Sequence, residues 1–361
     1  MCTSCSTCGR ECKCKCPEFP SAVPIESTND LIRGSDEEVR SQLSQILKEV
    51  FRDQGYPELT KWTRLDEGVG YLSKVITVTI KWQENGNADK AKLPTQFVVK
   101  LPSSEKLVEG FNNLSSDEHK ADQESVERAV SNCHNAECNV YRYFKQLKTI
   151  QVPAPAMYGA LDRNDCHSGF IIMDDWSSIG CLPDFLEGMN LTQCIEIVEA
   201  IATYQAAGFV DHRWKSSLQP IPNDMMKAIV THAFKAHEIM AQNYADIYKF
   251  DNKTVADLID EEHVLEAITP KESDIAVICH GDLWSNNVML RKNSSSKPSD
   301  QLLGLIDWQL AHPGHPTEDI TRFIAASVKP ELREAYTDFL LQKYLSKLEL
   351  LLKEHGNFEL S

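Results

Sequence analysis

The sequence contains no long uninterrupted run of apolar residues. A helix that crosses the hydrocarbon core of a bilayer needs roughly 20 predominantly apolar residues, and no run in these 361 residues approaches that length. The first residues also lack the apolar region of a secretory signal. We therefore expect no transmembrane segment and a cytoplasmic location.

Basic residues are scarce relative to acidic ones. The chain has 37 Lys and Arg against 53 Asp and Glu, which gives a formal net charge of −16. Proteins that bind nucleic acids neutralise phosphate charges with Lys and Arg. A nucleic-acid partner is therefore not expected.

Cysteine is unevenly distributed, because six of the twelve cysteines lie in the first sixteen residues. The spacing of the first four of these is C-x2-C-x2-C-x3-C, an iron–sulfur type of spacing, but Lys13 stands where proline follows the fourth cysteine in such motifs. This segment also lacks apolar residues that could bury a cluster. A disordered tail over residues 1–24 is favoured over metal binding or thioester lipidation. The other six cysteines are scattered singly and indicate reduced thiols of a cytosolic protein.

The remaining pattern predicts two lobes, since 361 residues are many for a single core. Ser35 and Glu38 form a capping box that opens a first helix. Strand-like stretches follow at 71–82, 95–101 and 169–176, and a long helical pattern fills 125–148. Helices then predominate, near 192–208, 222–248, 253–268, 317–327 and 331–354, interrupted by short strands at 287–291 and 302–307. The expected fold class is α+β, with a small β-rich lobe over 25–173 and a larger helical lobe over 174–361.

Residues 280–287, "HGDLWSNN", carry the most informative spacing. The pattern H-x-D-L-x-x-x-N is that of a kinase catalytic loop. In such a loop Asp282 would accept the proton of the attacking hydroxyl, and Asn287 would reach a magnesium ion on the phosphates. The alternative is an Asx-turn between two strands.

Asp307 ends the apolar stretch "LLGLID" and fits a second magnesium ligand. The alternative is an ordinary acid at the end of a strand. Its position shortly after the 280–287 loop favours the functional interpretation.

Lys100 lies inside the apolar stretch "FVVKL", which resembles the strand lysine of kinases. Its alternative is an edge-strand lysine that faces water. Glu137 falls on the apolar stripe of the long predicted helix, where a carboxylate needs a cation. We therefore predict that Glu137 pairs with Lys100, whereas Glu124 and Glu127 lie off the stripe and are expected to face solvent.

Three further residues complete the predicted nucleotide site. Gly68 and Gly70 precede the first strand and could cover phosphates with backbone N–H groups, although a plain turn has the same pattern. Met173 ends a buried strand between the lobes, where adenine would meet backbone groups.

This ordered set of residues, together with "LIDWQLAHPGHPTEDITRF", resembles the CHK kinase-like family, which includes the ecdysteroid kinase-like proteins and is similar to choline kinases and aminoglycoside phosphotransferases. The resemblance covers roughly residues 30–350 and implies a two-lobed, protein-kinase-like fold. It implies that Asp282 is the catalytic base, that Asn287 and Asp307 hold Mg2+, and that Lys100 binds phosphate. It also makes Asp319 a structural acid.

After Asp307 only about ten residues precede the next predicted helix, and no A-P-E sequence follows. A peptide-docking segment does not fit there, so a small-molecule substrate with a hydroxyl group is expected. The predicted function is transfer of the γ-phosphate of ATP to that hydroxyl, with ATP and Mg2+ as cofactors. The aromatic-rich motif of choline kinases is not visible, which disfavours choline. The alternatives are a pseudokinase or nucleotide-binding module, and an interaction or metal-buffering protein that acts through its cysteine-rich tail.

Overall fold

The computed structural model describes residues 35–65, 72–83, 93–108, 123–164, 167–249 and 275–355. They form two compact units. The sheet unit consists of the described residues up to Cys138 together with Pro155–Ser178, and the helical unit consists of Asn139–Ala154 and the described residues from Ile179 onward. The division into lobes over 25–173 and 174–361 stays a prediction. The predicted tail, the glycine pair and the helix predicted at 253–268 lie outside the described residues.

Five antiparallel strands form one sheet among the described residues of the sheet unit. Their order is β1 (Pro57–Arg64), β2 (Ser73–Trp82), β3 (Gln96–Pro102), β5 (Phe170–Asp174) and β4 (Met157–Leu161). Alternate residues of the inner strands are apolar and pack into one core, because side chains alternate between the two faces of a strand. The three predicted strands of this region correspond to β2, β3 and β5, whereas β1 and β4 were not predicted.

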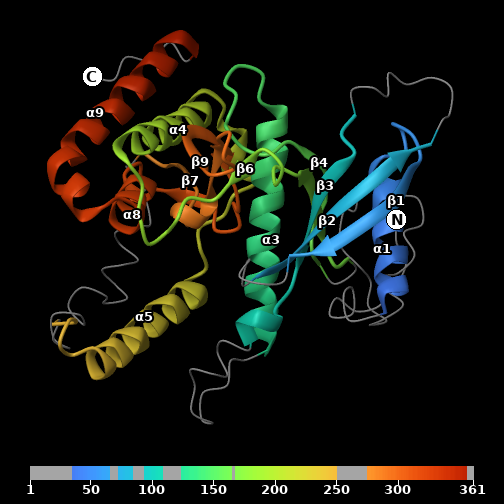
Figure 1. The fold of residues 1–361 in the computed structure, drawn as a ribbon, viewed down its shortest axis with the longest axis horizontal. Coiled ribbons are helices and arrows are strands. Elements are labelled where there is room, and N and C mark those ends of the chain that lie inside the picture. Colours follow the sequence, from blue (N-terminus) through green and yellow to red (C-terminus); the bar gives the residue numbers. More distant parts are fainter. Residues whose placement is uncertain are drawn as a thin grey trace. The chain divides into compact units, whose positions relative to one another are not determined.

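Helix α1 (Asp36–Val50) begins at the predicted capping box. The Glu38 carboxylate accepts hydrogen bonds from the Ser35 backbone N–H at 2.6 Å and from the Ser35 hydroxyl at 2.9 Å. The helix lies beside β1 and buries its apolar stripe in the same core as the sheet (Figure 1).

Helix α3 (Gln123–Gln146) confirms the long predicted helix, and its residues up to Cys138 belong to the sheet unit. The expectation that Glu127 faces solvent is wrong. Its carboxylate pairs with the guanidinium of Arg163 and accepts a 2.7 Å hydrogen bond from the Ser104 hydroxyl. Glu124 is exposed as predicted, with 82% of its side chain accessible. Arg163 lies just beyond β4, the strand that the sequence did not reveal, so no partner for Glu127 was visible.

The helical unit is built around helix α4 (Leu191–Val210), which is buried along most of its length. It lies beside α9 (Pro330–His355), as Figure 1 shows, and also contacts α8 (Glu318–Ser327). The unit also contains α5 (Asn223–Asn243) and the short helices η2 (His212–Ser216) and η3 (Ser285–Asn287). Short strands pair as β6 (Gly180–Cys181), β8 (Val288–Lys292) and β9 (Pro298–Leu305), and as β7 (Val277–Cys279) with β10 (His312–Gly314).

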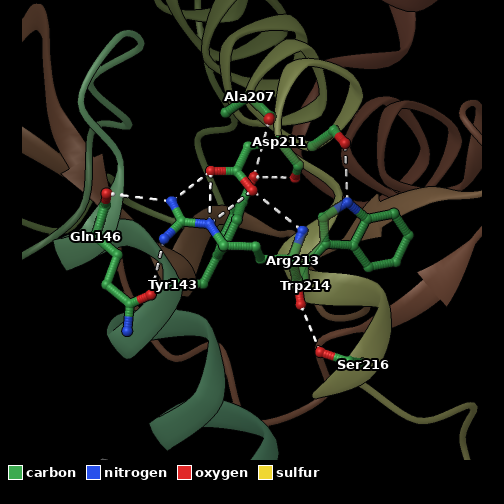
Figure 2. A network of polar contacts seen from close by, with 8 residues as sticks. Tyr143, Gln146, Ala207, Asp211, Arg213, Trp214 and Ser216 are labelled. Atoms are coloured by element: carbon green, nitrogen blue, oxygen red, sulfur yellow. Dashed lines mark hydrogen bonds and ion pairs between the residues drawn. The ribbon is translucent and has the colours of Figure 1, made fainter.

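A polar network within the helical unit holds the last turn of α3 against the end of α4 (Figure 2). The Tyr143 hydroxyl lies 2.8 Å from the carbonyl oxygens of both Ala207 and Asp211. Arg213 binds the Asp211 carboxylate and donates a 3.1 Å hydrogen bond to Gln146 Oε1. These contacts join polar groups at the ends of the two helices, and the Ala207 carbonyl also accepts a 2.9 Å hydrogen bond from the Asp211 N–H that caps α4.

The α+β class predicted from the sequence is confirmed, with one sheet-rich and one mainly helical unit. In the described part of the chain, no helix has both the length and the apolar character that crossing a membrane requires.

His134 makes the sheet unit sensitive to acid. Its ring is buried and lies 2.9 Å from the Leu161 carbonyl oxygen. Burial, helped by the nearby charges of Lys100 and Arg163, lowers the pKa of His134 to about 4. The unfolded chain therefore binds more protons than the folded chain between the ordinary pKa of 6.5 and about pH 4.

We expect the free energy of unfolding to fall as the pH decreases through this window, with His134 accounting for about 3 kcal/mol of the loss. Replacing His134 with Gln removes the titrating group and should flatten the dependence between pH 6.5 and 4. Urea unfolding at a series of pH values measures the effect. His212→Gln, at an exposed histidine of η2, is the matched control. An unchanged acid dependence in His134→Gln would contradict this assignment.

Candidate active site

The predicted catalytic loop follows β7 in the helical unit, and a buried carboxylate holds its first turn. Asp319, near the start of α8, accepts hydrogen bonds from the backbone N–H groups of His280 at 2.7 Å and Gly281 at 3.0 Å. The Tyr204 hydroxyl donates a third at 2.5 Å. Asp319 has no exposed surface, and a buried carboxylate needs such donors. The structural role that the family resemblance implies for Asp319 therefore has a clear geometric basis.

Gly281 fits this turn because it has no side chain. Its backbone φ is +78°, in the left-handed region that glycine adopts without steric cost. A Cβ atom at this position would lie 2.2 Å from the carbonyl oxygen of Leu310 and 3.0 Å from Nδ1 of His312. The second position of the H-G-D sequence is therefore closed to other residues in this conformation.

The imidazole of His280 connects the loop to the strand that precedes Asp307. Nδ1 accepts a 3.3 Å hydrogen bond from the Asp282 backbone N–H. The ring proton therefore lies on Nε2, which donates a hydrogen bond to the Ile306 carbonyl oxygen at 3.0 Å. The ring also packs against the fully buried Trp308, with centroids 4.5 Å apart. No separate role was predicted for His280, although its place in the H-x-D pattern was the available signal.

Asp282 and Asn287 are brought together as the spacing predicts. The Asn287 side-chain amide donates to the Asp282 carbonyl oxygen at 2.7 Å and to its carboxylate Oδ2 at 3.1 Å. These bonds use the amide nitrogen of Asn287 and leave its oxygen for another partner. These bonds are not those of an Asx-turn, in which a side-chain oxygen accepts from the backbone two residues on, because here the Asn287 amide nitrogen donates to a residue five positions earlier.

Asp307 lies one residue past a hydrogen bond that joins the two segments, from the Ile306 N–H to the Asn287 carbonyl at 3.0 Å. Its φ is +65°, a left-handed conformation that costs a residue other than glycine roughly 1–3 kcal/mol and occurs often at functional sites. Asp282, Asn287 and Asp307 therefore lie on two stretches of the helical unit, 282–287 and 306–307, that hydrogen bonds join into one connected segment.

Arg322, on α8, is a functional candidate that the sequence analysis missed. Its guanidinium forms an ion pair with Oδ1 of Asp282. About half of the Arg322 side chain is exposed, against 19% of Asp282. Nothing in the spacing of the sequence links these residues, which lie 40 positions apart.

In the sheet unit, the predicted pair of Lys100 and Glu137 is confirmed as a contact. Lys100 Nζ on β3 lies 2.7 Å from Glu137 Oε2 on α3, with 8% and 1% of their side chains exposed. The alternative of a lysine facing water is therefore wrong. A strand lysine paired with a helix glutamate is the arrangement that positions phosphate-binding lysines in kinases.

We expect replacement of either partner to damage the same interaction. Lys100→Met and Glu137→Gln each leave one buried group without its partner. The double variant should be little worse than the worse single variant, with a coupling free energy of about 1–3 kcal/mol. Urea unfolding of all four proteins measures the coupling in stability, and nucleotide titration measures it in binding. Fully additive losses in both would contradict a shared role.

Met173 is buried in β5, which lies between β3 and β4. It pairs with Val98 on one side and Met157 on the other. The adjacent Asp174 accepts hydrogen bonds from the Tyr158 hydroxyl and the Ala156 N–H. The adenine-binding role of Met173 stays a prediction, as do the roles of Gly68 and Gly70, which lie outside the described residues.

The donor set of the helical unit fits magnesium. Mg2+ prefers carboxylate and amide oxygens, and it is usually bound through one or two side chains plus phosphates and water. Asp307 supplies a carboxylate, and Asn287 has an amide oxygen that its hydrogen bonds to Asp282 do not use. Among the described residues there is no group of three His, Cys, Asp or Glu side chains suited to a metal. With these two side chains as its protein ligands, a magnesium ion here would also need phosphate oxygens or water.

Comparison with known protein families gives a match over most of the sequence. A family model named DUF1679 and described as "Uncharacterized oxidoreductase dhs-27" matches residues 42–360. The chain belongs to the DUF1679 family. This membership confirms the CHK kinase-like, ecdysteroid kinase-like resemblance.

A curated relative of this DUF1679 chain is the "Uncharacterized oxidoreductase dhs-27" of Caenorhabditis elegans. The two are 21% identical over 295 residues, which cover 80% of this chain and 35% of the relative. The chain therefore spans about a third of the length of the relative, and the reaction in the relative's name is not transferred to it.

Several solved phosphotransferase structures also resemble the DUF1679 chain. Macrolide 2'-phosphotransferase MphH from Brachybacterium faecium has a TM-score of 0.42 at 12% identity and covers 84% of this chain and 82% of its own. ADP-bound aminoglycoside phosphotransferase APH(2'')-Ib has a TM-score of 0.43 at 15% identity, covering 89% and 86%. A choline/ethanolamine kinase family protein from Mesorhizobium loti has 0.36 at 10% identity, covering 89% and 87%.

Proposed function

We propose that this chain is a kinase that transfers the γ-phosphate of ATP to a hydroxyl group of a small organic molecule. The observation that carries the proposal is the connected segment of the helical unit. There the Asp282 carboxylate accepts a hydrogen bond from the Asn287 amide. The Asn287 carbonyl in turn accepts one from the N–H of Ile306, the residue before Asp307. A base and two oxygen ligands for a metal are the groups that phosphoryl transfer requires.

The proposed roles follow from the chemistry of each side chain. Asp282 orients the acceptor hydroxyl and takes its proton as the oxygen attacks the γ-phosphorus; the bond to the bridging oxygen breaks and ADP leaves. Asn287 and Asp307 would hold magnesium, which would neutralise charge on the phosphate oxygens. Lys100 binds phosphate and is positioned by Glu137, while Gly68 and Gly70 cover the phosphates and Met173 meets adenine.

A small acceptor is favoured over a peptide by the segment after Asp307. Helix α8 begins at Glu318, and three of the intervening residues, His312–Gly314, form β10, which pairs with β7. This leaves little chain to form a peptide-docking surface of the kind that protein kinases build from their activation segment.

The test is incubation of the purified chain with labelled ATP and magnesium in a metabolite extract, followed by separation of labelled small molecules. Nucleotide binding is measured in parallel by titration with and without magnesium. We expect magnesium-dependent ATP binding and label transfer to at least one hydroxyl compound. Absence of nucleotide binding under both conditions would contradict the proposal.

The second candidate function is a nucleotide-binding module that does not transfer phosphate. The specific observation in its favour is the ion pair of Arg322 with Asp282, since it occupies one oxygen of the proposed base. Magnesium-dependent ATP binding without label transfer or ATP hydrolysis is the outcome that this candidate predicts.

A further inference from the structure

The roles proposed above leave Arg322 unused, although it touches the proposed base. Its guanidinium binds Oδ1 of Asp282, while the Asn287 amide binds Oδ2 of the same carboxylate. Both oxygens of Asp282 therefore have a partner within the helical unit. An acceptor hydroxyl that approaches Asp282 must share Oδ1 or Oδ2 with one of these donors.

Arg322 has hydrogen-bond donors that its contact with Asp282 does not use. A guanidinium carries five N–H groups in a fixed planar fork, and its contact with Asp282 uses one nitrogen, Nη2. About half of the side chain is exposed, and among the described residues the guanidinium has no other hydrogen-bond partner, so its remaining N–H groups are available to a bound molecule. A molecule whose hydroxyl reaches Asp282 would meet a fixed positive charge and open hydrogen-bond donors beside that hydroxyl.

This arrangement discriminates between acceptors by charge. An ammonium group on the carbon next to the hydroxyl would be repelled by the guanidinium and would find no acceptor on it. A neutral hydroxyl or a carboxylate in the same place would receive a hydrogen bond, which is stronger when one partner is charged. The net charge of −16 attracts cations toward the molecule as a whole, so the discrimination has to arise locally, at Arg322.

An aromatic pair near Asp282 in the sequence would favour acceptors with an ammonium group instead. Trp284, two residues after Asp282, packs edge-on against the half-exposed Phe185 with ring centroids 5.5 Å apart. Aromatic faces attract ammonium groups. At an exposed site, however, this attraction is modest, and an edge-on pair does not surround a cation as an aromatic cage does. The guanidinium is in direct contact with the proposed base, and we expect its charge to dominate.

We propose that Arg322 is a specificity-determining residue that selects hydroxyl compounds with an oxygen on the neighbouring carbon, such as 1,2-diols and 2-hydroxy acids. The same residue disfavours amino alcohols. This inference rests on the proposed kinase function and narrows its substrate class. Arg322 acts by orienting the carboxylate of Asp282 and by contacting the acceptor group beside the reacting hydroxyl.

The test uses a panel of hydroxyl compounds in matched sets, in which the carbon next to the reacting hydroxyl carries a hydroxyl group, is itself the carbon of a carboxylate, or carries an ammonium group. Two readouts are taken for each compound: phosphorylation with magnesium and ATP, and binding measured as a shift in melting temperature without ATP. The proteins are the full chain and its Arg322→Gln, Arg322→Lys and Arg322→Glu variants. Lys329→Gln removes the same charge from an exposed position just past α8 and is the matched control.

We expect the wild-type chain and Lys329→Gln to prefer the hydroxyl or carboxylate members roughly tenfold to hundredfold over the ammonium members, the usual worth of a hydrogen bond to a charged group. Arg322→Gln should lose this preference, Arg322→Glu should reverse it, and Arg322→Lys should restore it in part. Arg322 is half-exposed, so these variants are expected to fold.

Equal preferences in the wild-type chain and Arg322→Gln would overturn the inference, and so would a wild-type preference for ammonium members. In either case the kinase proposal stands, provided that the wild-type chain phosphorylates some member of the panel. If the wild-type chain neither binds magnesium-ATP nor hydrolyses it, the kinase proposal fails and this inference fails with it.

Discussion

Asp282→Asn should bind magnesium-ATP almost as well as the wild-type chain, while phosphate transfer falls by roughly 10²–10⁴-fold, the usual worth of a positioned base. The amide has nearly the same shape as the carboxylate but cannot take the proton of the acceptor hydroxyl. It also removes the ion pair with Arg322, which lies on the surface of α8 and contributes little to folding. Nucleotide titration and turnover of an identified acceptor measure the two effects separately.

Asp307→Asn should instead lose magnesium-dependent nucleotide binding as well as turnover. Its proposed role is to hold the metal in the ground state, so the phosphates lose the ion that neutralises and orients them. Asp338→Asn, at an exposed acid of α9, is the control for loss of one negative charge. If Asp282→Asn abolishes nucleotide binding while Asp307→Asn preserves it, the two roles are wrongly assigned. If neither change affects a confirmed activity, the kinase proposal fails.

Asp319→Ala should destabilise the helical unit on the order of 5 kcal/mol. The substitution leaves the N–H groups of His280 and Gly281 and the hydroxyl of Tyr204 without their shared acceptor, and a buried donor without a partner costs roughly 1–3 kcal/mol. A loss of this size is comparable to the whole stability of many domains. Urea unfolding, or the soluble fraction where the variant does not accumulate, measures it.

Two milder variants make the role of Asp319 testable if the alanine variant does not fold. Asp319→Asn keeps the shape but turns an amide nitrogen toward backbone N–H groups, so about half of the loss is expected. Tyr204→Phe removes one donor and leaves the loop contacts of Asp319 in place, so its cost should be about 1 kcal/mol. A Tyr204→Phe variant as unstable as Asp319→Asn would mean that the loop contacts are not what matters.

The sequence revealed the elements whose residues carry their own pattern. The capping box at Ser35 predicted the start of α1, and the buried stripe of α3 singled out Glu137 as an acid in need of a cation. The spacing of His280, Asp282 and Asn287 predicted a loop that the structure closes with hydrogen bonds. In each case the chemistry depends on residues close in the sequence, or on a polar residue in an apolar setting.

Strands β1 and β4 escaped prediction because they are the two edges of the sheet. An edge strand has one side that pairs with no other strand, so its sequence tolerates proline, glycine and polar residues. β1 begins at Pro57 and has mostly polar residues, while Pro153 and Pro155 precede β4, which contains Gly159. Neither stretch shows the apolar alternation that identified the inner strands.

Arg322 escaped prediction for a different reason. Its importance comes from one contact with Asp282 on a separate element, and a surface arginine on a helix is ordinary in itself. The same holds for Glu127, whose partners Ser104 and Arg163 lie on other segments. Long-range polar contacts of this kind leave no periodic signal in the sequence.

The glycine at position 281 also bears on how such a protein could be controlled. Protein kinases have arginine at this point of the loop, in H-R-D, and many of them are switched on when phosphorylation of the activation loop creates new contacts to arginine. Here a Cβ atom would already collide with the Leu310 carbonyl, 2.2 Å away. The backbone of this loop is therefore incompatible with that arginine, and a phosphorylation switch of this type could not be acquired by a single substitution at Gly281.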